Sequence, residues 1–440
     1  MHVGRRLSYG LIAVGLVLLG VVAGVLLSRG HAAKQSAPPT TTTVARPPAP
    51  AGPLTTTPVA PGAIRIVWKG GGRAAVGLAG EPPTIWVSGG DVTLGGLSFT
   101  ASYDVHAGSS TVTVSPSEPT GPVTGSVADG VMLLDGQPFF PILLWGQCPS
   151  YDPLLALGID VFMNNPCGGI EAQVGALAGK GLSVAEAPGA AGAGVIGSYY
   201  PDEADGHGYT GVTLPAADGL RFLTLTNHFY SAAAPLPAGK AIYPGLVAKA
   251  DVVGFDLYPL QVWCRRSALP DVAAAQRELV RLAAGKPTFQ WIETTHMQCP
   301  FGDGALAVTP ATVRAESWLA LVGGAHGLGF FPIGWTGDVS GALAQMGHDI
   351  QALGPVLLAP AAPVSPEAPV EATARSYGGA FYVFAVNPTY APVKATISAP
   401  GLDGRPLQVL GENRTVTPAS GAFADDFAPL AVHLYVAPPG

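Results

Sequence analysis

The sequence has little charge for its length. Asp, Glu, Lys and Arg make up 12% of its 440 residues, about half of the usual share in globular proteins. The basic residues form no stripe and the formal net charge is −7, so no nucleic-acid partner is expected. The 7 Trp, 13 Tyr and 15 Phe, with a hydrophobic fraction of 48%, exclude disorder for most of the chain. The length indicates two or three folded domains.

Motifs for metals and cofactors are also lacking. The four cysteines show no C-x-x-C spacing, which argues against a zinc site. No G-x-G-x-x-G opens a helix, and no H-x-H pair stands at the end of a predicted strand. The nine His residues still leave a metal-dependent hydrolase open as an alternative. We expect no metal and no organic cofactor.

The N-terminal segment is apolar. Gly10–Leu27 carries no charge and follows Arg5 and Arg6, which predicts a membrane-spanning helix with its N-terminus inside. A cleaved secretory signal is the alternative, and on either interpretation the rest of the chain is exported. We therefore expect an anchor or signal segment over 1–30. Residues 31–62 should be a Pro/Thr-rich linker that holds the folded part away from the membrane.

Three patterns divide the rest of the chain. Short β-like runs between turn residues predict a small β domain over 63–128. Over 129–360, eight apolar strand-like runs alternate with helical stretches, which predicts a (β/α)8 TIM barrel, with a doubly wound open sheet as the alternative. Alternation and turns over 361–440 predict an antiparallel β-sandwich. The eight runs are Phe140–Trp145, Ile159–Asn164, Leu182–Ala187, Val195–Tyr200, Phe222–His228, Val252–Tyr258, Thr288–Glu293 and Gly327–Gly334.

Two glutamates stand at the ends of predicted barrel strands, where the active sites of such barrels lie. Glu203 follows the fourth run, and Glu293 ends the seventh. Two carboxyl groups about 5–5.5 Å apart across a sugar-sized cleft act as acid/base and nucleophile in retaining glycoside hydrolysis. The alternative is structural: Glu203 caps the following helix and Glu293 pairs with a surface base.

Several segments, taken in order, resemble clan A glycoside hydrolases, which are retaining barrel glycosidases with a β-sandwich appended to many members. The resemblance covers roughly residues 130–438. It implies a barrel, a C-terminal sandwich and double-displacement chemistry. The matching stretches are DGQPFFPILLWG, YYPDE, ADVVGFDLYP, GGAHGLGFFPIGW, GGAFYVFAVNPTYAPVKATIS and FAPLAVHLYV.

The resemblance implies roles for individual residues. Glu203 would be the acid/base and Glu293 the nucleophile, with Tyr258 hydrogen-bonded to Glu293 and Trp335 as an aromatic floor under the sugar. The family usually has Asn before the acid/base, where this chain has Asp202, and this difference leaves the sugar specificity open.

Further candidates for substrate binding follow from their place at strand ends. Asp256 could contact sugar or position the neighbouring tyrosine, and His228 could line the site or be a buried structural histidine. Asn164 or Asn227 could replace the missing asparagine. The full set of predicted substrate-binding residues is Trp145, Asn164, Asp202, Asn227, His228, Asp256, Tyr258 and Trp335.

The strand assignment also orders the cysteines, which allow three pairings. Cys148 and Cys167 follow the neighbouring first and second strands, and Cys264 and Cys299 follow the sixth and seventh. We predict disulfides 148–167 and 264–299, both bracing loops of the active site.

The sequence thus predicts a retaining glycoside hydrolase that acts outside the cytoplasm on a polysaccharide or oligosaccharide. Glu293 would attack the anomeric carbon while Glu203 protonates the leaving oxygen, and no cofactor is needed. The alternative is a non-catalytic glycan- or cell-wall-binding protein on the same barrel, which the change to Asp202 allows.

Overall fold

The computed structural model describes residues 54–440, with gaps at 149, 187–188, 190–191, 200, 207–218, 232–238, 300–305, 333 and 403. The predicted anchor or signal segment and most of the predicted linker lie outside the described residues. Within the described part of the chain, no helix is both long and apolar enough to cross a membrane.

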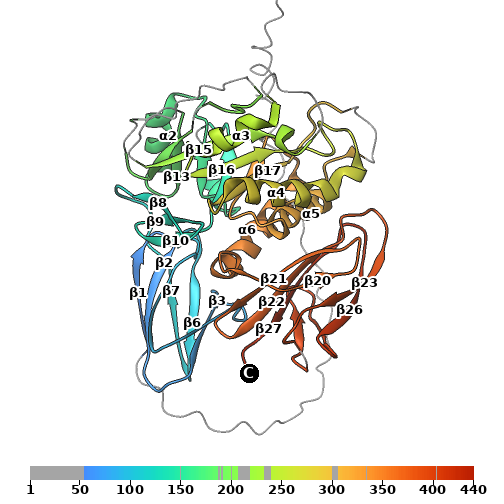
Figure 1. Cartoon of the computed structure of the whole chain (residues 1–440). Helices are drawn as coiled ribbons and strands as arrows, with labels where there is room; N and C mark the ends of the chain where they lie inside the picture. The colour runs from blue at the N-terminus through green and yellow to red at the C-terminus, as the bar shows by residue number, and fades with distance from the viewer. Residues whose placement is uncertain are drawn as a thin grey trace, which may run out of the picture. The chain divides into compact units, whose positions relative to one another are not determined.

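Eight parallel strands form a closed barrel, part of which is visible in Figure 1. Each strand pairs with the next in chain order, and β18 closes the ring by pairing with β11. All eight predicted runs form strands, and the TIM barrel is confirmed in place of an open sheet. The strands are β11 (Ile142–Trp145), β12 (Val161–Met163), β13 (Leu182–Ala185), β14 (Val195–Tyr199), β15 (Leu220–Thr226), β16 (Val252–Asp256), β17 (Thr288–Glu293) and β18 (Leu328–Phe331).

Large aromatic rings fill the interior of the barrel. Phe222, Phe289 and Trp291 belong to one buried cluster. Two glycines make room for these rings, because a Cβ on Gly254 would lie 2.1 Å from Phe289 and one on Gly329 would lie 2.2 Å from Trp291. The absence of a side chain at Gly329 therefore fixes the place of Trp291, which reaches the pocket described below.

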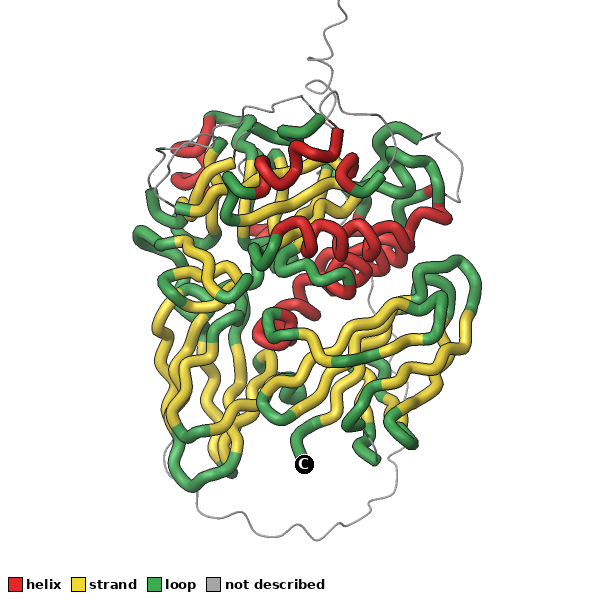
Figure 2. The backbone as a smooth tube through the Cα atoms, viewed as in Figure 1, coloured by secondary structure: helices red, strands yellow, loops and turns green. Residues whose placement is uncertain are grey.

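The helices lie outside the barrel strands and are drawn in red in Figure 2. Helix α5 begins with a capping box between Thr309 and Thr312 and has Pro310 in its first turn. It packs against β17, α4 and α6, so most of its residues are buried. The α-helices are α1 (Asp152–Leu155), α2 (Gly169–Leu177), α3 (Tyr243–Val247), α4 (Leu269–Ala283), α5 (Pro310–Val322) and α6 (Gly337–Leu357), with 3-10 helices at Asn227–Phe229, Gly239–Ile242 and Arg266–Ala268.

Three small antiparallel sheets precede the barrel, and they extend over residues 55–139, beyond the 63–128 predicted for the β domain. Their strand orders are β1-β2-β5, β4-β3-β6-β7 and β10-β9-β8. The last contains a hairpin that turns at Asp135 and Gly136. The strands are β1 (Thr55–Ala60), β2 (Ala63–Val67), β3 (Arg73–Leu78), β4 (Ile85–Ser88), β5 (Asp91–Leu94), β6 (Tyr103–Ala107), β7 (Ser110–Val114), β8 (Gly125–Ala128), β9 (Val131–Leu134) and β10 (Gln137–Phe139).

The predicted extent of the linker is wrong at its C-terminal end. Residues 55–60 were assigned to an extended tether, but they form β1 and pair antiparallel with β2. Three consecutive threonines favour a strand because β-branched side chains suit the pleated backbone. Pro58 is tolerated because β1 is an edge strand with only one neighbouring strand. The missing N–H of proline therefore costs no hydrogen bond to a second strand.

The C-terminal region forms two antiparallel sheets, which confirms the predicted sandwich. Their orders are β19-β21-β22-β27-β24-β25 and β20-β23-β26. A separate apolar cluster that includes Val383, Ile397 and Phe423 is contributed by both sheets. The strands are β19 (Ala361–Ala362), β20 (Ser365–Pro366), β21 (Glu371–Tyr377), β22 (Ala380–Val386), β23 (Val393–Ser398), β24 (Leu407–Val409), β25 (Arg414–Val416), β26 (Ala422–Phe427) and β27 (Val432–Ala437).

Candidate active site

A pocket of about 410 Å³ lies where the carboxyl ends of the barrel strands meet. This is the end of the barrel at which loops from different strands converge, so side chains distant in sequence can act together. Seven of the ten predicted catalytic and substrate-binding residues line it. The described lining residues are Trp145, Asp202, Glu203, Thr224, Thr226, Asn227, His228, Asp256, Tyr258, Val262, Trp291, Met297, Gln298 and Phe331.

The turn after β14 is anchored to the end of β15 by a buried carboxylate. Asp205 is 0% exposed and accepts hydrogen bonds from the Thr226 N–H (2.8 Å), the Thr226 hydroxyl (2.7 Å) and the Tyr243 hydroxyl (2.8 Å). Glu203, two residues earlier, has a left-handed backbone with φ of 45°. Non-glycine residues adopt this conformation infrequently, and tertiary contacts must hold it. The anchored turn therefore presents Glu203 to the pocket in one defined orientation.

Glu203 and Asp256 form a carboxyl pair in the pocket. They come from the ends of β14 and β16, and their side chains are within hydrogen-bonding range of each other. Burial, followed by the hydrogen bond to Glu203 and the negative charges of Glu203 and Asp202, raises the pKa of Asp256 well above its usual range. The ionised form of Asp256 is therefore disfavoured in this pocket, because it would place a second negative charge beside Glu203.

Aromatic rings form much of the rest of the pocket wall. The ring centroids of Trp145 and Trp291 are 5.7 Å apart in an edge-to-face arrangement. Tyr258 and Phe331 are stacked at 5.8 Å with an interplanar angle of 25°. The Trp291 indole N–H donates to the Thr224 hydroxyl (3.3 Å), which fixes the orientation of that ring. Rigid aromatic faces of this kind suit the C–H surfaces of a sugar ring.

Asn227 and His228 supply polar groups on one side of the pocket. The Asn227 side-chain carbonyl accepts a hydrogen bond from the Ser231 hydroxyl (3.0 Å), which orients its amide. The His228 N–H donates to the Thr226 hydroxyl (3.3 Å), and its imidazole Nδ1 is buried without a hydrogen-bond partner among the described residues. A buried unpartnered nitrogen at a pocket wall is available to a ligand.

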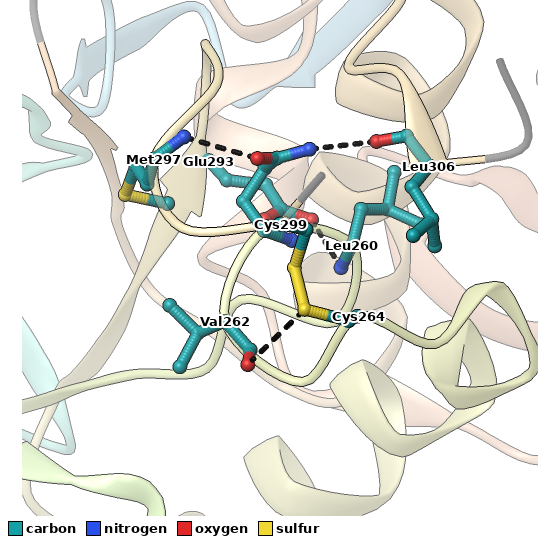
Figure 3. Close-up of a disulfide and its surroundings, with 8 residues drawn as sticks. Leu260, Val262, Cys264, Glu293, Met297, Cys299 and Leu306 are labelled. Carbon is teal, nitrogen blue, oxygen red and sulfur yellow. Dashed lines mark hydrogen bonds between the residues drawn. A yellow bond between two sulfur atoms is a disulfide. The ribbon is translucent and has the colours of Figure 1, made fainter. Parts of the chain in front are cut away.

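The structure places Glu293, the predicted nucleophile, outside the described pocket lining. Glu293 is 0% exposed and does not line the pocket. Its two carboxylate oxygens instead accept the backbone N–H groups of Leu260 (2.8 Å) and Gln261 (2.9 Å), in the loop that follows β16 (Figure 3). Those buried N–H groups need an acceptor, and the carboxylate at the end of β17 supplies it.

A second buried carboxyl group contacts Glu293 from α5. Glu316 is 1% exposed and lies close enough to Glu293 for their charges to interact, and neither of its carboxyl oxygens has a hydrogen-bond partner among the described residues. Burial raises the pKa of Glu293 to about 7, although the bonds from Leu260 and Gln261 oppose the shift. Burial and the negative charge of Glu293 raise the pKa of Glu316 well above its usual range, so Glu316 carries the proton of this pair.

Glu293 supports the pocket from behind its wall. The adjacent Gln261 donates its side-chain amide to the Leu306 carbonyl (2.7 Å) and accepts the Met297 N–H (3.0 Å). Val262 and Met297, which flank these contacts, line the pocket. The buried carboxylate is therefore a structural clamp between the loops that follow β16 and β17.

Two further predicted binding residues lie outside the described pocket lining. Trp335 packs against the main apolar core, because β18 ends at Phe331 rather than at Gly334 as predicted. Phe331 thus occupies the wall where an aromatic floor was expected. Asn164 has a left-handed backbone, φ of 58°, and is half-buried near Gly146. Tyr258 does line the pocket, but no bond from it to Glu293 is found among the described residues.

Both predicted disulfides are confirmed. Cys148 pairs with Cys167 and Cys264 with Cys299, with Cα–Cα distances of 5.3 and 5.5 Å. Each joins loops that follow neighbouring barrel strands. The second lies beside Leu260 and Glu293, as Figure 3 shows. Among the described residues, no group of three or more His, Cys, Asp or Glu side chains could hold a metal ion.

Seven of the described lining residues were not predicted, and three of these carry little sequence signal because they lie in loops: Val262, Met297 and Gln298. Trp291 could have been found, because it alternates with Phe289 on the interior face of β17. That alternation fixes the direction of residues within a strand. Alternation does not predict the side-chain direction of the last residue of a strand, because that direction depends on the neighbouring loops.

No protein-family model matches the sequence, and no curated protein matches it. Solved structures are similar in architecture. A GH30 endoxylanase from Clostridium papyrosolvens C71 is 11% identical with a TM-score of 0.42, over 72% of this chain and 99% of that one. A noncanonic maltogenic alpha-amylase from Thermotoga neapolitana is 8% identical, TM-score 0.39, over 67% and 98%. A β-glucuronidase from Ruminococcus gnavus is 9% identical, TM-score 0.34, over 63% and 60%.

Fold and site together define the class of this protein. It is a (β/α)8 barrel with flanking β-sheet regions and a pocket at the carboxyl ends of its strands. The pocket combines aromatic walls with a proton-sharing carboxyl pair. The function of this pocket has to be inferred from its own side chains, because the fold alone does not determine the reaction.

Proposed function

We propose that this protein is a glycoside hydrolase that acts on an extracytoplasmic glycan, with Glu203 as the general acid. The observation that carries the proposal is the Glu203–Asp256 pair, which keeps a proton on a carboxyl group within an aromatic-walled pocket. A glycosidase needs such a proton to protonate the leaving oxygen. Asp256 supplies the shared proton, and Glu203 delivers it to the substrate.

An extracytoplasmic location is supported by the two disulfides. Structural disulfides persist in oxidising compartments and are rare in the cytosol. Both bonds brace loops at the carboxyl ends of the strands, which keeps the pocket in shape outside the cell. The predicted apolar segment at the N-terminus would deliver the chain there.

The test is turnover of a panel of disaccharides and oligosaccharides, whose poor leaving groups need a proton, by the wild type and by Glu203→Gln. Removing a general acid costs about 10²–10⁴-fold in rate. Glu186→Gln is the matched control, because Glu186 is exposed and outside the described pocket lining. Equal turnover by Glu203→Gln and Glu186→Gln would reject the proposal.

A second candidate function has its own support. Hydrogen-bonded carboxyl groups lie closer than the separation of about 5–5.5 Å used in retaining hydrolysis. The same pocket could therefore bind a glycan without cleaving it, as a wall- or glycan-binding module. Calorimetric binding of an oligosaccharide by the wild type, without any product by chromatography, would favour this function.

A further inference from the structure

Two buried polar atoms of the pocket residues have no hydrogen-bond partner within the described part of the chain. One is Nδ1 of His228, just past the end of β15, and the other is Oδ1 of Asp256, at the end of β16. Both residues line the pocket of about 410 Å³, which falls in the range of sites for small ligands. A buried polar atom without a partner costs free energy. Two such atoms in one pocket indicate a ligand that completes their hydrogen bonds.

Thr226 fixes the two residues relative to each other. It is the register partner of Asp256, because β15 and β16 pair in parallel at that position. Its hydroxyl accepts the His228 backbone N–H (3.3 Å) and donates to the buried carboxylate of Asp205 (2.7 Å). Neighbouring strands lie about 5 Å apart, so the imidazole and the carboxyl group can contact one sugar ring.

A hydroxyl group suits both atoms whatever their protonation state. The imidazole Nδ1 donates or accepts according to the tautomer and charge of the ring, and a carboxyl oxygen accepts when ionised and donates or accepts when protonated. A hydroxyl oxygen both donates and accepts, so it can pair with each atom in every case. A carboxylate substituent only accepts, and it would lie beside the carboxyl group of Glu203, which faces Asp256.

We propose, building on the glycosidase function above, that His228 and Asp256 bind two hydroxyl groups of one sugar residue. The substrate class is therefore a glycan whose sugar in this pocket is unsubstituted at both positions. An O-acyl or O-alkyl group at either position removes the hydroxyl proton and adds volume where the two residues need a small polar partner. Trp145 and Trp291, which meet edge-to-face, supply the apolar contact for the same ring.

The first experiment needs no variant and uses the full protein with monodeoxy disaccharides. The parent is the disaccharide that the wild type cleaves fastest in the panel above, and each analogue lacks one hydroxyl of the glycone, the sugar whose anomeric bond is cleaved. We expect the loss of either bound hydroxyl to lower kcat/KM by about 10- to 100-fold, because one buried atom of the pocket then stays unpaired.

Variants of His228 identify the hydroxyl that its Nδ1 binds. His228→Phe keeps a planar ring without the nitrogen, so we expect it to abolish the loss caused by one deoxy substitution and to leave the other losses unchanged. Any effect of the missing hydroxyl on the reaction itself is the same in both enzymes and cancels in this comparison. His228→Asn is the matched control, because its amide places a polar atom at the Nδ1 position and should keep the wild-type pattern.

Asp256 is tested by binding rather than by turnover, because it also faces Glu203. In the Glu203→Gln background the disaccharides are not consumed, and calorimetry gives their affinities. We expect Asp256→Ala in that background to abolish the affinity difference between the parent and a second deoxy analogue, other than the one assigned to His228.

Equal kcat/KM for the parent and every analogue overturns the hydroxyl contacts and leaves the glycosidase function standing. The same holds if every deoxy loss persists in His228→Phe and in Asp256→Ala while both variants keep the Tm of their parent protein. If the wild type cleaves no oligosaccharide of the panel, the glycosidase function falls, and the substrate class inferred from it falls as well.

Discussion

Glu203 and Asp256 present hydrogen-bonded carboxyl groups to one pocket from the ends of β14 and β16, two strands apart in the barrel. The contact brings together residues 53 positions apart in the sequence. Burial and the neighbouring Glu203 together raise the pKa of Asp256 well above its usual range. The pH dependence of activity should therefore change when Asp256 is replaced.

Asp256→Asn should shift the alkaline limb of the kcat/KM profile to lower pH by about one pH unit or more. In the wild type the proton is retained because two neighbouring carboxylates repel each other. With asparagine at position 256, no second carboxyl group helps Glu203 to retain its proton. The protonated form of Glu203 is therefore lost at a lower pH. A pH–rate profile on an aryl glycoside measures the shift. Asp338→Asn, at an exposed position in the first turn of α6, is the control. An unmoved alkaline limb in Asp256→Asn would contradict the pairing.

Glu293→Gln should keep kcat/KM within about 10-fold of the wild type while lowering stability. Loss of a true nucleophile in a hydrolase costs about 10⁴-fold or more. Here the change removes one acceptor from the buried N–H groups of Leu260 and Gln261, which costs about 1–3 kcal/mol of unfolding free energy. Paired kinetic and urea-unfolding measurements decide between the roles. Complete inactivation with unchanged stability would restore Glu293 as the nucleophile.

Glu316→Gln should stabilise the protein at pH 8 more than at pH 5. The pKa of Glu293 is raised to about 7 and that of Glu316 is also raised, both from an ordinary value of 4.5. Above pH 4.5 the folded protein thus binds more protons than the unfolded chain, so these groups lower the free energy of unfolding as pH rises. The glutamine side chain at position 316 does not ionise, so the variant loses less unfolding free energy as the pH rises.

The measurement is the Tm difference between Glu316→Gln and the wild type at both pH values. Glu118→Gln, at an exposed position before β8, controls for a general change in charge. A Tm difference that is the same at pH 5 and pH 8 would show that the buried pair does not titrate in this way.

Trp145→Ala should raise KM for an oligosaccharide by about 10-fold, because a flat ring of the pocket wall is lost. Trp335→Ala is the matched control, since Trp335 packs against the core rather than in the described pocket lining. Its KM should remain that of the wild type. The reverse pattern would place the sugar on Trp335, as the sequence predicted.

Most of the fold could be predicted, because each barrel strand is a short apolar run and each loop carries turn residues. The disulfides followed from strand order alone. The side-chain direction of Glu293 could not be predicted, because it depends on N–H groups 32 and 33 residues earlier in the chain and on Glu316 in the next helix. The Glu203–Asp256 contact likewise depends on how three strands are staggered, which no local pattern records.

The most direct test of the central role of Glu203 is the leaving-group dependence of Glu203→Gln. A general acid matters most when the leaving group is a poor one, since a good leaving group departs without a proton. We predict that Glu203→Gln loses about 10²–10⁴-fold in kcat/KM on a disaccharide, yet keeps nearly wild-type kcat/KM on a 2,4-dinitrophenyl glycoside of the same sugar. An equal loss on both substrates would contradict the assignment of Glu203 as the proton donor.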